Sequence, residues 1–339
     1  MSLDSRTPVL HGMRDEALVR KDRYEQFCER VYVPLYSKPW WMDAVCGSEN
    51  WDVWLYEEGG HIAAAMPYYL EERKYGLYIT KPPLTQNNGI VFDHPVGAGI
   101  VARAKFEEKV VRAAMAHVDS LGLAVYEQQF PTSYITWLPH SWCGCAALPR
   151  YTYVIKDTSD LDSVWQGMSS SYRKNVKKGR RNLASVGELD RERFWIEHAK
   201  VFERQNLPVP FSRTMWTRLF DAAYAAQSGR ALCAVTGDGQ VASVLFLVWD
   251  ERRMYHLLGG TMPGFSGLET YNALTWTGIE LAHEKGLAYD FEGSMIERIA
   301  KSFREFGGTP ELYFRIRKVY SPEVVRMEAE QHVSRLEVS

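Results

Sequence analysis

Two stretches far apart in the chain have the same pattern, and this internal repeat constrains the fold more than any other feature. Residues 60–79, GHIAAAMPYYLEERKYGLYI, align without a gap with residues 239–258, GQVASVLFLVWDERRMYHLL. In each stretch two apolar, β-branched and aromatic runs flank a charged tip, EERK or DERR, which is typical of a β-hairpin. A repeat of this kind predicts two units of similar fold.

The similarity continues downstream, where a helix leads into a strand in both halves. The sequences are AHVDSLGLAVYEQQ from residue 116 and LAHEKGLAYDFEGS from residue 281. When the shared Gly-Leu-Ala is aligned, YEQQF (126–130) of the first copy corresponds to DFEGS (290–294) of the second. Gly286 stands where a helix C-terminal cap is expected.

The second half can be assigned in full, and it predicts a mostly antiparallel sheet with helices on both faces. Three kinds of pattern support the assignment: apolar runs, helical periodicity and Gly/Pro breaks. The expected strands are 148–156, 231–236, 241–249, 253–259, 288–293 and 310–318, and the expected helices are 160–183, 190–206, 212–226, 268–285 and 296–306.

Length and composition limit the number of domains and the classes of function. A chain of 339 residues predicts two domains, which we place at 1–146 and 147–325 with a tail at 326–339. The net charge of −2 gives no general attraction to nucleic acid. We expect no membrane span and no signal peptide, and therefore a cytoplasmic protein. The five cysteines lack zinc-site spacing, so no metal is expected.

One local basic segment stands out against this neutral background. YRKNVKKGRR places six cations within ten residues, and on a helix they form two adjoining stripes. Arg173, Lys174 and Lys177 are the candidate substrate contacts, because an anionic partner would relieve the repulsion. A solvated surface helix is the alternative.

Three segments together resemble a known superfamily. They are SKPWWMDAV (37–45), MSSSYRKNVKKGRRN (168–182) and the block from DFEGSM to FREFGG (290–308). With the order of elements, they resemble tandem GNAT N-acyltransferases of the Fem-like branch, which includes peptidoglycan-bridge aminoacyltransferases and is similar to sugar N-acyltransferases. The resemblance implies an α/β (α+β) fold of two GNAT-like domains. We expect the acyl donor on the second domain and the acceptor on the first, because the corresponding loop of the first half is stiffened by Pro82 and Pro83.

In GNAT enzymes the acyl thioester enters between the fourth and fifth strands, and its pyrophosphate lies on the loop after the fourth strand. Here that loop is 259–267, where Gly259, Gly260, Gly264 and Gly267 would let backbone N–H groups turn toward an anion. The usual signature, Gln/Arg-x-x-Gly-x-Gly/Ala, is missing, so a plain flexible connection is the alternative.

A second pair of cations could support the donor. Lys301 and Arg304 share a helix face and are candidate cofactor contacts, or else surface cations. Fem-type relatives carry a Phe-Lys pair near this point, but Ser302-Phe303 stands there in this chain. The catalytic lysine therefore cannot be transferred to that position, and Lys301 or Arg304 is the alternative that could replace it by an altered helix phase.

Amide formation needs a proton acceptor and stabilisation of the oxyanion. If 288–293 is the fifth strand, Asp290 and Glu292 face the same side, with Glu292 the first candidate for general base and Asp290 the second. Ser294 could donate to the substrate or cap the next helix. His256, in the fourth strand, is a further candidate base or a structural histidine.

Candidate acceptor contacts lie in the first half: Trp40, Trp41, Gln86 and Asn87 could stack on a ring and bond to hydroxyls, although packing explains the tryptophans equally well. The favoured function is an acyl-CoA-dependent N-acyltransferase that acts on a nucleotide-linked aminodeoxysugar and binds no DNA. The alternatives are an aminoacyl-tRNA-dependent transferase acting on a cell-wall precursor, and a non-catalytic binding protein.

Overall fold

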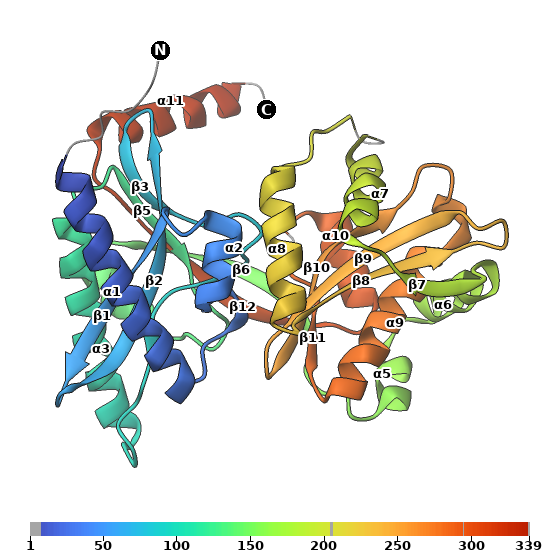
Figure 1. Cartoon of the computed structure of the whole chain (residues 1–339), viewed down its shortest axis with the longest axis horizontal. Coiled ribbons are helices and arrows are strands. Elements are labelled where there is room, and N and C mark those ends of the chain that lie inside the picture. Colours follow the sequence, from blue (N-terminus) through green and yellow to red (C-terminus); the bar gives the residue numbers. More distant parts are fainter. Residues whose placement is uncertain (1–7, 204–205, 294, 338–339) are drawn as a thin grey trace. The chain divides into compact units, whose positions relative to one another are not determined.

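The computed structural model describes residues 8–203, 206–293 and 295–337 (Figure 1). The chain forms two compact units. The first unit is Met1–Pro149 together with Tyr313–Ser339, and the second unit is Arg150–Leu312. The chain therefore leaves the first unit within strand β6 (Ala146–Ile155) and returns to it within strand β12 (Thr309–Val319).

The first unit is a sheet in the order β1-β2-β3-β5-β12, with β4 paired to β2. Its strands are antiparallel except for β3 and β5, which run parallel and are joined by the long helix α3. The elements are α1 (Pro8–Arg30), η1 (Leu35–Ser37), α2 (Pro39–Cys46), β1 (Trp51–Glu58), β2 (His61–Arg73), β3 (Gly76–Thr80), β4 (Val91–Phe92), α3 (Ile100–Ser120), β5 (Val125–Gln129), α4 (Leu138–Trp142) and, after β12, α11 (Pro322–Glu337).

The second unit has the strand order β6-β11-β10-β9-β8-β7. Here too a single parallel pair, β10 with β11, is joined by a long helix, α9. The elements are α5 (Leu161–Gly167), α6 (Ser170–Asn182), β7 (Ser185–Glu188), α7 (Arg191–Glu203), α8 (Arg213–Ala225), β8 (Gly229–Val235), β9 (Val241–Trp249), β10 (Arg253–Thr261), η2 (Ser266–Leu268), α9 (Thr270–Lys285), β11 (Ala288–Asp290) and α10 (Glu297–Glu305).

The repeat seen in the sequence is also a repeat in the structure. Gly60 and Gly239 precede the two hairpins with φ of 80° and 79°, and Gly122 and Gly286 follow the two long helices with φ of 64° and 67°. These left-handed values favour glycine. The predicted α/β fold, with a mostly antiparallel sheet flanked by helices, is confirmed.

The cores of the two units correspond as well. In the first unit buried residues of β2, β3 and β5 pack against α3, and in the second unit buried residues of β9, β10 and β11 pack against α9. Each sheet therefore buries one face beneath its long helix, as the 3.6-residue period of the helices predicts.

Several local predictions were wrong. The single helix expected at 160–183 is two helices, because Met168 is extended and the Ser169 side chain caps α6 by accepting the Tyr172 N–H. In the first hairpin the acids of the expected tip lie in β2, and the turn is at residues 74–75. The strand expected at 288–293 ends at Asp290.

The unit boundary also differs from the predicted one. The last strand, expected to belong with 147–325, pairs from Arg315 to Val319 with β5 of the first unit. Backbone hydrogen bonding therefore assigns residues from Tyr313 onward to the first unit, and a boundary drawn by sequence order alone misses this return.

Candidate active site

The parallel strands β10 and β11 separate soon after they meet. They pair only at Arg253 with Ala288, Met254 with Tyr289 and Tyr255 with Asp290, the last residue of β11. β10 continues to Thr261 and keeps its other neighbour, β9, to the end. The predicted gap between the fourth and fifth strands is therefore present in the second unit.

A bulge lies in β10 at the start of this gap. His256 pairs with Leu247 and Leu258 pairs with Phe246, so Leu257 is the extra residue. The extra residue of a bulge is left out of the ladder. Because β11 ends at Asp290, which pairs with Tyr255, Leu257 has no pairing partner on β11.

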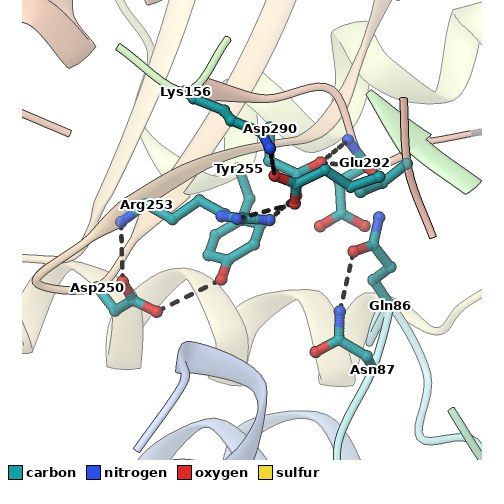
Figure 2. Close-up of polar contacts among 10 residues, drawn as sticks. Gln86, Asn87, Lys156, Asp250, Arg253, Tyr255, Asp290 and Glu292 are labelled. Carbon is teal, nitrogen blue, oxygen red and sulfur yellow. Dashed lines mark hydrogen bonds and ion pairs between the residues drawn. The ribbon is translucent and has the colours of Figure 1, made fainter. Parts of the chain in front are cut away.

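Asp290 is buried at the end of β11, where three hydrogen-bond donors hold its carboxylate. Its carboxylate is fully buried and accepts hydrogen bonds from the Thr152 hydroxyl, from Nη1 of Arg253 at 2.9 Å and from the backbone N–H of Glu292 at 2.8 Å (Figure 2). Burial raises the pKa of Asp290, while the Arg253 guanidinium opposes that shift. Three donors thus hold Asp290 in place.

Glu292 comes next in an unusual backbone conformation. Its φ is 67°, and that of Gly293 is 57°. A Cβ at Gly293 would lie 2.3 Å from the Tyr151 carbonyl oxygen, so only glycine fits there. This turn ends the strand alternation that was expected to place Asp290 and Glu292 on one face. Burial raises the pKa of Glu292 well above its ordinary value.

Further charges form a network with Asp290. Nη2 of Arg253 lies 3.1 Å from Glu311 Oε2, and Lys156 lies 3.1 Å from the other oxygen of Glu311. Arg253 is about a quarter exposed, and the two acids beside it raise its pKa although burial opposes that shift. The arginine therefore joins β10, β11 and β12 through their side chains, and it stabilises the point where the strands part.

His256 is enclosed beneath α9. Nδ1 lies 2.7 Å from the Tyr289 hydroxyl, and Nε2 lies 2.6 Å from the Tyr271 hydroxyl. Burial lowers the pKa of His256 to about 3. Both ring nitrogens are occupied, so the histidine has no nitrogen available for a substrate, and its contacts are those of a structural residue.

The predicted glycine loop is shorter than expected. Gly259 and Gly260 lie within β10, not in the loop, and both are closely packed: a Cβ would lie 2.7 Å from the Tyr271 hydroxyl oxygen at Gly259 and 2.6 Å from Val201 at Gly260. The loop proper begins at Met262. Gly264, with φ of 85°, and Gly267 both border open space. These two remain candidate anion contacts.

Helix α6 packs against this loop and the start of α9. A Cβ at Gly179 would lie 2.2 Å from the Glu269 carbonyl oxygen, and Asn182 Nδ2 donates to the Leu268 carbonyl at 2.9 Å. Glu269 places an acid at the N-terminus of α9, which disfavours a phosphate there. Any phosphate held here would depend on the α6 cations.

The two cationic stripes of α6 have different environments. Arg173 donates to the carbonyls that end α5, Lys177 lies 5.7 Å from the Trp165 ring centroid, and Arg180 forms an ion pair with Glu280. Within the described parts of the chain, the other stripe has no such partners, and all of its members are exposed: Lys174, Lys178 and Arg181. Of the predicted substrate contacts, Lys174 and Lys177 are exposed, whereas the Arg173 guanidinium donates to backbone carbonyls.

The remaining predicted residues of the second unit are on or near α10. Lys301 and Arg304 are exposed on that helix, and Ser294 lies outside the described residues. Phe303 and Phe306 hold α10 against Phe291 at ring separations of 5.1 Å and 5.7 Å. The helix is therefore fixed by its apolar face, which leaves its cations in solvent.

The predicted acceptor residues of the first unit are largely buried. Trp41 is fully buried and donates to the Thr85 hydroxyl at 2.9 Å, while Trp40 is partly exposed. Gln86 and Asn87 are 5% and 6% exposed and are hydrogen-bonded to each other at 2.9 Å. Trp40 is the most accessible of these four.

Three important residues were not predicted: Arg253, Thr152 and Leu257. Arg253 was visible in the sequence only as part of a charged hairpin tip. The bulge at Leu257 is a feature of the backbone, which leaves no signal in residue type. Among the described residues, no group of three or more His, Cys, Asp and Glu could hold a metal ion, and no helix is long and apolar enough to cross a membrane.

Comparison with known proteins finds a GNAT domain in the sequence and similar folds among solved structures. Residues 170–296 match the family model of the acetyltransferase (GNAT) domain. The crystal structure of FemX superposes with a TM-score of 0.65 at 11% identity, covering 86% of this chain and 94% of that one. The structure of L-PGS from Bacillus licheniformis superposes with a TM-score of 0.54 at 11% identity, covering 93% of this chain and 95% of that one. No curated protein matches in sequence.

Proposed function

We propose that this chain, whose residues 170–296 match the acetyltransferase (GNAT) domain and whose fold resembles that of FemX, transfers an acyl group from coenzyme A to the amino group of a nucleotide-linked aminodeoxysugar. The separation of β10 and β11 after Tyr255 and Asp290 carries this proposal. A gap between two strands admits a narrow, extended thioester arm, and β10 leads directly to a loop beside a basic helix.

The donor phosphates would be held outside the gap. Gly264 and Gly267 offer backbone N–H groups with no side chain in the way. The exposed stripe of α6, defined by Lys174, Lys178 and Arg181, lies on the helix whose Gly179 and Asn182 contact the end of this loop at Glu269 and Leu268. In this proposal the phosphates contact the exposed stripe of Lys174, Lys178 and Arg181. The other stripe of α6, with Arg173 and Arg180, is already engaged by protein groups.

The reaction would take place at the inner end of the gap. The amine nitrogen attacks the thioester carbonyl carbon, and the Leu257 N–H donates to the oxygen as it becomes negative. Glu292 accepts the proton that the nitrogen loses. The C–S bond then breaks as the carbonyl reforms, and the thiolate of coenzyme A leaves and takes up a proton.

Asp290 and Glu292 would have separate roles. Asp290 is held by the Thr152 hydroxyl, the Arg253 guanidinium and the Glu292 backbone N–H, which makes it a positioning residue for the turn that carries Glu292. The raised pKa of Glu292 suits a base, because a carboxylate of higher pKa binds the amine proton more strongly once it is ionised.

An aminoacyl-tRNA donor is the second candidate, and one observation favours it. Three exposed cations lie on one face of α6, and cations in a row at helical spacing could follow successive phosphates of an RNA strand. A tRNA would also reach the gap through its acyl-bearing end. The acceptor would then be a cell-wall precursor.

Isothermal titration with acetyl-CoA separates the two donors. We expect saturable binding, weakened at least ten-fold in a Lys174→Gln/Lys178→Gln/Arg181→Gln variant. The matched control is Arg193→Gln/Arg213→Gln/Arg230→Gln, which removes three exposed cations from elsewhere in the second unit. Absence of binding at millimolar acetyl-CoA, with tight binding of aminoacyl-tRNA, would replace the first donor by the second.

A further inference from the structure

A short segment of the first unit exposes aliphatic side chains that globular proteins usually bury. Val96 is 105% exposed, Ile100 is 89% exposed and Val101 is 68% exposed. Every residue from Ile100 to Lys105 is exposed, and Phe106 is the first buried residue of α3. The helix thus begins with about a turn and a half that contributes nothing to the core. We name residues 95–105 the α3 tip.

The α3 tip is amphipathic in a specific way. At about 100° per residue, Ala104 lies about 40° and Val101 about 100° from Ile100 around the helix axis. Lys105 then lies about 40° beyond Val101, and Arg103 lies about 60° on the other side of Ile100. One apolar arc is therefore flanked on both sides by a cation.

The charges of the α3 tip favour an anionic surface. No acid occurs from residue 95 to residue 105, and within the residues that the structure describes neither Arg103 nor Lys105 makes a side-chain ion pair or hydrogen bond. The nearest acids are engaged: Asp93 lies 3.4 Å from Arg30, and Glu107 lies 2.7 Å from His94. Both cations are free to meet phosphate groups.

We propose that the α3 tip docks this chain onto an anionic phospholipid bilayer. Val96, Ile100 and Val101 enter the boundary between headgroups and acyl chains, while Arg103 and Lys105 extend along the apolar arc to the lipid phosphates. A turn precedes α3: Gly97 has φ of 74°, and the Ala98 N–H donates to the Pro95 carbonyl at 3.1 Å. This surface shares no residue with the proposed donor site.

Co-sedimentation of the full chain with vesicles tests the proposal. We expect binding to vesicles of phosphatidylcholine mixed with phosphatidylglycerol. A Val96→Gln/Ile100→Gln/Val101→Gln variant should bind at least ten-fold more weakly, because the apolar contact is lost. An Arg103→Gln/Lys105→Gln variant should lose about five-fold for each charge on mixed vesicles and change little on pure phosphatidylcholine.

The control removes exposed aliphatic side chains elsewhere in the same unit. Leu18 and Val19 of α1 are 57% and 59% exposed, and a Leu18→Gln/Val19→Gln variant should keep wild-type vesicle binding. Wild-type protein that stays in the supernatant would overturn the proposal, as would equal losses in tip and control variants. If sedimentation velocity instead shows a dimer that the tip variant dissociates, the partner is a second copy and the membrane proposal fails.

Discussion

The strand after the long helix can be compared directly between the two units. In the first unit Tyr126 packs beneath α3, and the next residue, Glu127, points to the opposite face and meets arginines. In the second unit Tyr289 packs beneath α9, and the next residue, Asp290, also meets an arginine. Up to this point both copies place the same types of side chain on the same faces.

The copies differ beyond the acid. β5 continues through Gln128 to Gln129, and the buried Gln128 side chain donates to the Pro67 carbonyl at 2.9 Å. β11 ends at Asp290, and the chain turns left-handed through Glu292. An ion-paired acid on the strand is therefore a shared structural feature, whereas a second carboxyl on a left-handed turn belongs to the second unit alone. This difference favours the second unit as the place of chemistry.

Substituting Glu292 of the second unit and Glu127 of the first unit tests the difference between the units with the largest expected effect. Glu292→Gln should lower kcat for acyl transfer from acetyl-CoA by about 10²–10⁴-fold, because a proton acceptor is lost. Glu127→Gln should change kcat less than about three-fold, since it takes no part in proton transfer. A second control is Glu297→Gln on the exposed start of α10. Equal losses in all three variants would remove Glu292 from the mechanism.

Removing an arginine from each unit comes next. Arg253→Gln leaves Asp290 buried without its cation, and we expect a loss of about 3–5 kcal/mol in the free energy of unfolding. Arg315→Gln should cost only about 1 kcal/mol, because Arg317 remains 3.2 Å from Glu127. Urea unfolding monitored by circular dichroism measures both. Similar losses would mean that the two acids are held equally, contrary to the geometry.

Glycine substitutions give a smaller difference. Gly293→Ala combines a left-handed φ with a Cβ 2.3 Å from a carbonyl oxygen, so we expect a loss of about 3 kcal/mol. Gly97→Ala in the first unit has a similar φ of 74° but open space, so backbone strain alone should cost about 1 kcal/mol. If thermal unfolding gives equal losses, the turn after Asp290 is not held by close packing.

The pH dependence of stability should show the smallest effect. Because burial raises the pKa of Glu292 above 4.5, the folded protein binds more protons at this site than the unfolded chain does above that pH. Stability contributed by this site is therefore present at low pH and is lost as pH rises through the raised pKa. Unfolding free energies of wild type and Glu292→Gln should diverge as the pH rises above 4.5, with the variant favoured at high pH. Parallel curves would contradict the burial of this carboxyl.

The sequence predicted most elements because its signals were local: hairpin alternation, helical period, and Gly286 at a helix end. It could not predict that β12 returns to the first unit, because strand partners far apart in sequence are set by packing. It also misaligned the site by one residue. Aligning Gly-Leu-Ala placed Tyr126 opposite Asp290, whereas burial places it opposite Tyr289.

The residues of the candidate site also differ in how far the sequence could predict them. Residue type alone made Glu292 and Lys174 candidates, and their roles stay predictions. Arg173 and His256 had equally suggestive types, but their partners are the carbonyls after α5 and two buried tyrosine hydroxyls, which only the fold brings near. Side-chain identity suggests a role, and competition from neighbouring groups in the fold decides it.

Hydrogen–deuterium exchange with and without acetyl-CoA tests most directly whether the second unit holds the donor. Bound donor should slow amide exchange at 257–268, where the bulge and the loop lie, and leave residues 81–90, which come after β3 in the first unit, unchanged. Protection at 81–90 without protection at 257–268 would place the donor in the first unit and contradict the assignment of chemistry to the second.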